Sequence, residues 1–236
     1  MSLDQWPRRV AALAQFRVDD PSAPILRADD EHHLRRVLRA REGEEVVVTN
    51  GGGDWALARV VADGLERVSD VDADPAPTPV TIYLAPLKGD RGDWAVAKAT
   101  EIGVTRIVPL ISARLAVKFR GETAARVVSR WRRIAGEAAG QCRRTHDVLV
   151  DEPVGVLQVP DDVAIADIGS GDDWSGVHAV AIGPEGGWEP GEWDETRRRV
   201  SLGSSVLRAE TAALAAAVTL VARRDGWGVT SGPADG

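Results

Sequence analysis

The chain has 236 residues, of which 44% are hydrophobic and 28% charged, with a formal net charge of −7. This length allows one large domain or two modest ones with a buried core, and the composition is that of a globular protein. No run of 18 apolar residues occurs, and the first residues lack the basic and apolar regions of a signal peptide. The single cysteine excludes an intramolecular disulfide, and neither it nor the four histidines show a metal-ligand spacing. We therefore expect a cytoplasmic protein with no membrane span and no metal.

The N-terminal third is expected to be β-rich. Strand-like runs alternate with turn signals, and Asn50-Gly51-Gly52-Gly53-Asp54 is typical of a hairpin. The predicted elements are a short strand at residues 24–26, a helical turn at 31–39, strands at 45–49 and 55–61, and a further strand near 65–71. The proline-rich stretch 70–79 then reads as an extended linker. We expect one domain over residues 1–73.

The rest of the chain alternates strands and helices, which predicts an α/β domain with a mostly parallel sheet. Residues 80–87 and 104–110 are apolar strands that flank a helix ending at Gly103, with Trp94, Ala97 and Ile102 on one face. Further elements are a helix at 121–142, strands at 164–168 and 179–182, and a helix at 209–224. We expect this domain over residues 74–228 and a disordered tail at 229–236.

Two glycine loops organise this second domain. The apolar run 179–182 stops at Gly183, with Gly186 and Gly187 close behind, and a second glycine loop begins at Leu202-Gly203 and leads into the last helix. Ligands in open α/β sheets bind beyond the carboxyl ends of the strands, so two such loops predict a pocket lined largely by backbone. A third strand, 164–168, also ends at a glycine, although its spacing does not match a dinucleotide loop. The alternative is that these loops are ordinary turns.

Three charged residues at the edges of these loops are the candidates for chemistry. Glu185 follows Pro184 between glycines, and Arg208 and Glu210 stand where the last helix begins. The alternative is that Glu185 is merely solvated and that Arg208 pairs with Glu210. The chain contains no Gly-x-Ser-x-Gly elbow and no phosphate loop, which disfavours a hydrolase or a nucleoside triphosphatase. Cys142 falls on the apolar stripe of the long helix, which favours packing over catalysis.

A basic region interrupts this acidic chain. Residues 114–144 carry nine Lys or Arg against two Glu, and Arg126, Arg130 and Arg133 share one face of the long helix. Such a face is commonly only solvated. Beside a ligand pocket, however, clustered arginine favours phosphate contacts with RNA or DNA. The predicted nucleic-acid-binding residues are Arg35, Arg36, Arg39, Arg126, Arg130 and Arg133.

Several spaced motifs together resemble one family. They are Ile182-Gly183-Pro184-Glu185-Gly186-Gly187, then Leu202-Gly203 with Val206-Leu207-Arg208 and Glu210-Thr211-Ala212, and the segments at 98–104, 109–114, 131–144 and 33–39. Over almost the whole chain, the sequence resembles the SPOUT methyltransferases of the RsmE type, which methylate uridine N3 in small-subunit ribosomal RNA. Ser205 departs from the family pattern, which commonly has arginine there.

The resemblance implies methylation of one specific uridine of 16S ribosomal RNA, on the assembled or assembling 30S subunit. It also implies S-adenosylmethionine as cofactor, a deep trefoil knot in the second domain, a PUA-like RNA-binding domain at the N-terminus, and a homodimer, whose interface we expect to include the alanine-rich last helix. The implied catalytic residues are Arg208, Glu210 and Glu185. The implied cofactor-binding residues are Ile182, Gly183, Pro184, Glu185, Gly186, Gly187, Leu202, Gly203, Ser204, Val206 and Leu207. The alternatives are a catalytically silent RNA-binding protein with the same fold and an enzyme that methylates a ribose 2′-hydroxyl.

Overall fold

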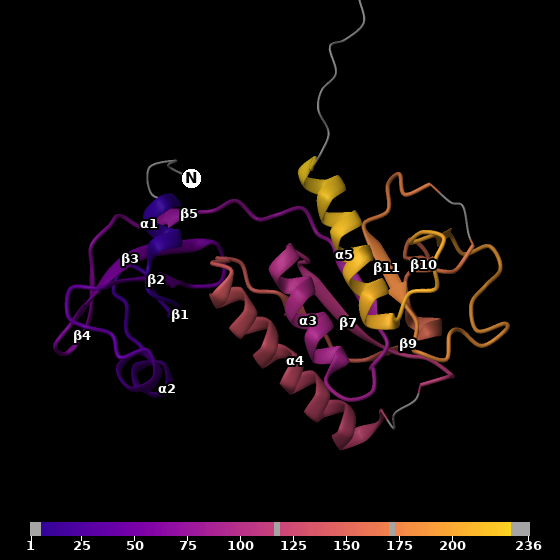
Figure 1. Ribbon diagram of the computed structural model, residues 1–236, viewed down its shortest axis with the longest axis horizontal. Coiled ribbons are helices and arrows are strands. Elements are labelled where there is room, and N and C mark those ends of the chain that lie inside the picture. The colour runs from indigo at the N-terminus through magenta and orange to yellow at the C-terminus, as the bar shows by residue number, and fades with distance from the viewer. Residues whose placement is uncertain (1–5, 116–118, 170–172, 228–236) are drawn as a thin grey trace, which may run out of the picture. The chain divides into compact units, whose positions relative to one another are not determined.

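The computed structural model describes residues 6–115, 119–169 and 173–227 (Figure 1). Its chain divides into two compact units, one formed by residues up to Pro77 together with Gly136–Asp147, and one formed by Thr78–Ala135 and the residues from Val148 onward. The segment that returns to the first unit was not foreseen from the sequence. The domain bounds 1–73 and 74–228 therefore stay predictions, and the tail at 229–236 lies outside the described residues.

The first unit is built on a small, mostly antiparallel sheet. Its strands are β1 (Gln15–Arg17), β2 (Glu45–Thr49), β3 (Asp54–Val61), β4 (Gly64–Arg67) and β5 (Asp72–Ala73), with β1 parallel to β2 and the other pairs antiparallel. Its helices are α1 (Trp6–Ala11) and α2 (Ala28–His32), which continues as a π-helical turn over His33–Val37. Alternation along β2 sends Val46 and Val48 into one apolar cluster and Val47 into another, so both faces of the sheet are covered. The predicted hairpin and the helical turn are confirmed.

The strand predicted at residues 24–26 is wrong. This segment has no regular secondary structure, and Ile25 is 81% exposed. Only Leu26 packs against the core of the unit. Pro24 has no backbone N–H to donate to a neighbouring strand, so two apolar residues after it are too few to add a strand to the sheet.

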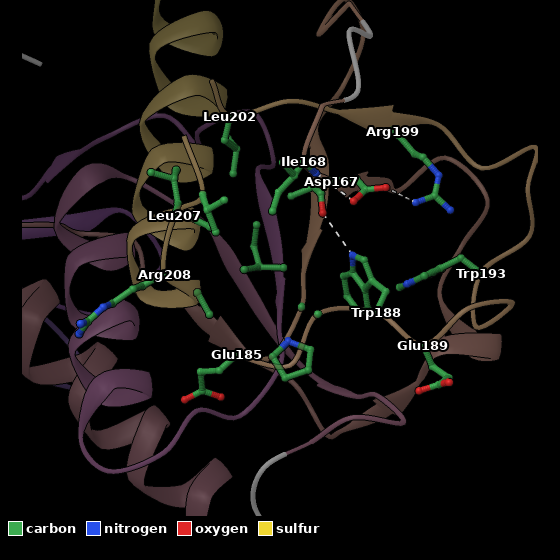
Figure 2. A pocket seen from close by; sticks show the side chains of 18 of the residues that line it. Asp167, Ile168, Glu185, Trp188, Glu189, Trp193, Arg199, Leu202, Leu207 and Arg208 are labelled. Carbon is green, nitrogen blue, oxygen red and sulfur yellow. Dashed lines mark hydrogen bonds and ion pairs between the residues drawn. The ribbon is translucent and has the colours of Figure 1, made fainter. Parts of the chain in front are cut away.

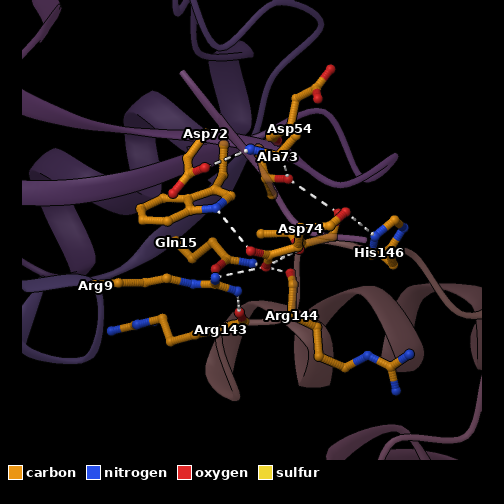
Figure 3. Close-up of polar contacts among 12 residues, drawn as sticks. Arg9, Gln15, Asp54, Asp72, Ala73, Asp74, Arg143, Arg144 and His146 are labelled. Atoms are coloured by element: carbon orange, nitrogen blue, oxygen red, sulfur yellow. Dashed lines mark hydrogen bonds and ion pairs between the residues drawn. The ribbon is translucent and has the colours of Figure 1, made fainter. Parts of the chain in front are cut away.

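Asp74 ties the end of this sheet to the segment that follows the long helix (Figure 3). Its carboxylate accepts hydrogen bonds from Arg9 Nη1 at 2.7 Å, Thr145 Oγ1 at 2.7 Å and Trp55 Nε1 at 3.2 Å. Its backbone carbonyl lies 3.0 Å from His146 Nε2. Burial alone would raise the pKa of the Asp74 carboxyl, but the bonds from Thr145 and Arg9 and the charge of Arg9 lower it below its usual value.

The second unit is organised around a parallel sheet. Its strands are β6 (Thr81–Leu84), β7 (Arg106–Ile111), β8 (Leu149–Val150), β9 (Val154–Gly155), β10 (Ala164–Ala166), β11 (Ala179–Ile182) and β12 (Arg199–Val200). They lie in the order β12-β10-β11-β6-β7-β8, with β9 also paired to β7, and every pair is parallel. The predicted α/β class with a mostly parallel sheet is confirmed. The knot that the resemblance implies stays a prediction.

Three helices supply the core on one face of this sheet. They are α3 (Arg91–Ile102), α4 (Gly121–Gln141) and α5 (Ala209–Asp225), and their buried residues share one cluster with Ile82, Val180 and Ile182. The alternate strand residues, such as Tyr83 and Ala181, point into a cluster on the other face, close to the short 3₁₀ helix Val156–Gln158. This alternation is what a strand covered on both faces requires.

Two details of helix packing differ from the sequence prediction. Trp94 is exposed on α3, whose buried residues are Gly92, Ala95, Val96, Ala99 and Thr100. Of the predicted face, Ile102 packs against the core. On α5, Ala213, Ala216 and Ala217 are buried in the unit's own core, where their small side chains let α5 pack closely. These alanines therefore serve packing within the chain, and Leu214 and Val218 remain on the outer side of the helix. None of the helices that the structure describes is long and apolar enough to cross a membrane.

Candidate active site

Three strand ends of the second unit meet at one cavity (Figure 2). The strands β10, β11 and β12 are neighbours and parallel, so their carboxyl ends lie at one edge of the sheet. The residues that follow them, near Asp167, Gly183 and Leu202, line a cavity of about 730 Å³. Its volume lies in the range of small-molecule and cofactor sites. The cavity therefore lies at the strand ends where the sequence predicts a ligand pocket.

Glycines give the cavity much of its backbone lining. Gly187 has φ +69° and Gly203 has φ +114°, conformations that residues with a Cβ rarely adopt. At Gly183 a Cβ would lie 3.1 Å from the Trp188 ring, so a larger residue there would displace the indole. The loops thus depend on glycine for conformation at two positions and for close packing at a third.

Two tryptophans brace the wall opposite the predicted catalytic side chains (Figure 2). Trp188 Nε1 donates a hydrogen bond to the Ala166 carbonyl oxygen at 3.2 Å, which joins the loop after β11 to β10. Its ring meets that of Trp193 at 5.1 Å between centroids and an interplanar angle of 89°, a favourable edge-to-face arrangement. On the same wall, Asp167 Oδ2 accepts a hydrogen bond from Arg199 at 2.5 Å. This wall is held by indole packing and one ion pair.

Arg91 connects two of the three predicted catalytic residues. As the first residue of α3 it lines the cavity, and its guanidinium nitrogens lie 3.7 Å from Glu185 Oε1 and 3.8 Å from Glu210 Oε1. Glu185 Oε1 also accepts a hydrogen bond from the backbone N–H of Lys88 at 3.1 Å. The Glu210 side chain is 15% exposed, and its buried Oε2 has no hydrogen-bond partner among the described residues. Two carboxylates and one guanidinium therefore form a charged cluster at this side of the cavity.

Hydrogen bonds of one carboxylate stabilise the segment of residues 186–193 at the edge of the cavity. Glu192 accepts hydrogen bonds from the backbone N–H groups of Ala113 at 2.6 Å and Glu189 at 2.9 Å. Arg114 pairs with Glu189, and this carboxylate raises the pKa of its guanidinium. Gly186 faces the same segment, because a Cβ on it would lie 3.4 Å from Arg114 Cβ. Gly186 therefore faces Arg114 and does not line the cavity.

Most predicted cofactor-binding residues line the cavity. These are Ile182, Gly183, Pro184, Glu185, Gly187, Leu202, Gly203, Val206 and Leu207, while Gly186 and Ser204 are not part of the lining. Sequence reasoning missed Arg91, Ala166, Asp167, Ile168, Trp188, Glu189, Pro190, Gly191, Trp193, Arg199, Ser205, Ala209 and Ala212. The third strand that ends at Gly169 was the available signal for Asp167 and Ile168. Trp193 and Arg199 had no comparable signal.

The predicted catalytic residues come together only in part. Glu185 and Arg208 line the cavity, and Arg208 is the residue that precedes the first turn of α5. Glu210 is not part of the lining and is linked to it through Arg91. The proposed pairing of Arg208 with Glu210 is replaced by pairing of Arg91 with Glu210.

Several of the predicted RNA-binding arginines are paired within their own units. Arg126 pairs with Glu122, Arg130 with Asp93, and Arg35 with Glu31. The Arg35 guanidinium also donates to the Val61 carbonyl oxygen at 2.5 Å. Arg133, Arg36 and Arg39 are exposed, and Arg39 adopts φ +55°, which is uncommon outside glycine. The three paired arginines are thus partly neutralised by their own carboxylates.

The groups that line the cavity and could contact a ligand are backbone, indole, carboxylate and guanidinium. Among residues 6–115, 119–169 and 173–227, no three His, Cys, Asp or Glu side chains gather closely enough to hold a metal ion. The fold and the site define an α/β protein with a small-molecule cavity at its strand ends and a charged cluster beside it.

Two protein-family models identify the family within this class. Residues 74–221 match the model of the RNA methyltransferase domain, and residues 26–69 match the model of the RNA methyltransferase PUA domain. The chain belongs to the RsmE-type family of RNA methyltransferases, which use S-adenosylmethionine.

Named relatives and solved structures agree with this assignment. The ribosomal RNA small subunit methyltransferase E of a Synechocystis strain is 33% identical, over 77% of this chain and 67% of its own. The protein of the same name from Mycobacterium bovis is 29% identical, over 84% of this chain and 86% of its own. A putative methyltransferase of Legionella pneumophila, solved with bound S-adenosylmethionine, has a TM-score of 0.76 and 27% identity over 89% of this chain and 97% of its own. A ribosomal RNA small subunit methyltransferase E of Neisseria gonorrhoeae, also bound to S-adenosylmethionine, has a TM-score of 0.74 and 28% identity over 88% and 96%.

Proposed function

We propose that this chain transfers a methyl group from S-adenosylmethionine to N3 of one uridine in the 16S ribosomal RNA of the small subunit. The observation that carries the proposal is the cavity of about 730 Å³ at the ends of β10, β11 and β12, lined by the glycine loops. Membership of the RsmE-type family supports the reaction class.

The residues of the cavity suit the cofactor. Glycine-rich backbone offers N–H and C=O groups for adenine, ribose and the amino-acid end, and the apolar side chains of Ile182, Leu202 and Leu207 suit the flat base. The carboxylates of Asp167 and Glu185 offer negative charge to a cationic ligand. When bound, the cofactor supplies an electrophilic methyl group on a sulfonium sulfur.

Uridine N3 sets the demands on the protein. N3 lies on the Watson–Crick edge and carries a proton, so the base must leave its stack and lose that proton before it can attack. Glu185, Arg208 and Glu210 are our candidates for positioning the base and accepting the proton. Attack by a ring nitrogen needs no nucleophilic cysteine, which agrees with the place of Cys142 at the end of α4, outside the cavity lining.

The RNA path is proposed to run over exposed arginines. Arg36 and Arg39 are exposed on the PUA-like unit. We retain Arg133, and we keep Arg35, Arg126 and Arg130 as weaker candidates because their guanidinium groups already pair with carboxylates. Phosphate contacts supply most of the sequence-independent affinity for RNA. Whether the substrate is the assembled or the assembling 30S subunit is part of the proposal to be tested.

We further propose a cytoplasmic homodimer with the trefoil knot of its family. Leu214 and Val218 offer apolar area on the outer side of α5, and Val218 is 40% exposed. Sedimentation at micromolar concentration tests the dimer, and a fully active monomer would contradict it.

Transfer of a labelled methyl group tests the function. Purified small subunits that lack the modification are incubated with the protein and S-adenosylmethionine labelled in its methyl group. We expect label in 16S ribosomal RNA, and a cavity variant such as Gly203→Ala to lower it. Absence of label in assembled subunits and in assembly intermediates would favour a silent RNA-binding protein.

A further inference from the structure

The guanidinium of Arg91 lies between two carboxylates beside the cavity. Its distances to Glu185 Oε1 and Glu210 Oε1 are 3.7 and 3.8 Å, which are ion-pair distances too long for hydrogen bonds. In the part of the chain that the structure describes, this group donates no hydrogen bond, and its side chain is 42% exposed. Arg91 therefore has N–H donors available to a ligand in the cavity it lines.

The two carboxylates fix where those donors lie. Glu185 is itself held by the Lys88 N–H, and Glu210 is largely buried at the start of α5. A flexible side chain between two fixed negative charges is held electrostatically, while its N–H groups remain unsaturated. This arrangement suits an acceptor that becomes more negative during a reaction, because the donors are in place before the charge develops.

Uracil is such an acceptor, and here the inference rests on the proposed function. The imide N3–H is a much weaker acid than a carboxylic acid, so transfer of its proton to a carboxylate is unfavourable without help. Loss of that proton spreads negative charge over N3 and the two ring carbonyl oxygens. A guanidinium that donates to one of these oxygens stabilises the anion and so makes N3 a competent nucleophile.

We propose that Arg91 is a catalytic residue that donates hydrogen bonds to a carbonyl oxygen of the target uracil as N3 is deprotonated by Glu185. The N3–H bond breaks, the proton goes to the Glu185 carboxylate, and the electron pair stays on the ring. The pair on N3 then forms the bond to the methyl carbon while the carbon–sulfur bond breaks and its electrons pass to sulfur. Glu185 afterwards releases the proton to water.

Two variants and a matched control test this role. Arg91→Gln removes the charge, Arg91→Lys keeps the charge but loses the planar fork, and Arg106→Gln removes an exposed arginine that pairs with Asp151 at the surface. Single-turnover methyl transfer to small subunits is measured from about pH 6 to about pH 9, a range over which the ionised fraction of uracil N3 rises. Calorimetry with S-adenosylmethionine measures cofactor affinity in the same proteins.

We expect Arg91→Gln to slow transfer about 100-fold at neutral pH, as loss of one donor to a developing oxyanion does, with cofactor affinity preserved. The deficit is expected to shrink as pH rises, because solvent then ionises N3. Arg91→Lys is expected to retain part of the wild-type rate, and the control Arg106→Gln is expected to keep the full wild-type rate. A variant that is equally slow at every pH, or that loses cofactor affinity in parallel, would show a structural role and overturn the proposal.

The acidity of the substrate gives a second, independent readout. Small subunits reconstituted with 5-fluorouridine carry a target whose N3–H is more acidic, so the loss from Arg91→Gln is expected to be smaller on them. An equal loss on both substrates would contradict the role. If the wild-type protein forms N3-methyluridine but Arg91→Gln behaves as wild type, only this inference fails. If the wild-type protein methylates another atom, the proposed function fails with it.

Discussion

The indole N–H of Trp188 and the carbonyl oxygen of Ala166 are joined by a hydrogen bond of 3.2 Å, which ties the loop after β11 to its neighbouring strand β10. Both residues line the cavity, so the bond presets one wall before a ligand arrives. In Trp188→Phe we expect a loss of about 1 kcal/mol in cofactor binding, roughly fivefold, because the ring packing stays and the bond is lost. Calorimetric titration measures it, and unchanged affinity would show that the wall is rigid without the bond.

Gly203 tests whether the second glycine loop binds the cofactor. A Cβ at this position meets no atom within 4 Å, and φ is +114°, so Gly203→Ala strains the loop and projects a methyl group from the lining. We expect at least about tenfold weaker cofactor binding, or about 1.4 kcal/mol. The matched control is Gly43→Ala, where φ is +92° and the space is also open, but which lies in the first unit. If both variants bind the cofactor equally well, the loop is not part of its site.

The Asp74 network predicts an acid-dependent loss of stability in the first unit. The pKa of Asp74 is lowered in the folded protein, so its stabilising contribution is present above the unfolded value of about 3.9 and is lost as pH falls through the folded value. Asp74→Asn leaves Arg9, whose side chain is 3% exposed, without its carboxylate. We expect it to lower the free energy of unfolding by about 3 kcal/mol at neutral pH. The difference between the two proteins, followed by urea titration, should narrow below about pH 4. A constant difference across that range would refute this account of Asp74.

Arg39 offers a test of RNA contact that does not depend on damaging the fold. Its φ of +55° is the conformation that glycine adopts freely, so Arg39→Gly should leave stability unchanged or raise it by up to about 1 kcal/mol. If its side chain contacts phosphate, RNA binding should weaken, and the slope of log affinity against log salt should fall by about 0.7–0.9. The Arg126→Ala variant serves as comparison, since its guanidinium already pairs with Glu122 2.9 Å away. If the salt dependence of RNA binding is unaltered in Arg39→Gly, the Arg39 side chain does not contact phosphate and the RNA binds elsewhere on the protein.

The sequence predicted the second unit well because its signals are local. Apolar runs such as residues 80–87 must be covered on both faces, and their alternation with helical patterns leaves a parallel sheet as the favoured arrangement. Glycines at 183, 187 and 203 marked the strand ends, and those ends form the cavity. Where a local run was too short to decide, as at Pro24 and Ile25, the prediction was wrong.

What the sequence could not give were contacts between distant segments. Arg91 reaches Glu185 and Glu210 only because α3, the loop after β11 and the start of α5 meet in space. The same holds for Asp74, whose partners Arg9 and Thr145 lie 65 and 71 positions away. A charge count likewise does not show which surface arginines are paired: it treats Arg130 as free, although Arg130 pairs with Asp93.

The chemical position of the methyl group tests the central claim most directly. Small subunits methylated by the protein are digested to nucleosides and identified by mass spectrometry, and the site is mapped by reverse transcription. We predict N3-methyluridine at one position of 16S ribosomal RNA, where a methyl group on the Watson–Crick edge stops the polymerase. A methyl group on a ribose 2′-hydroxyl, which lets the polymerase pass and protects the strand from alkaline cleavage, would contradict the account.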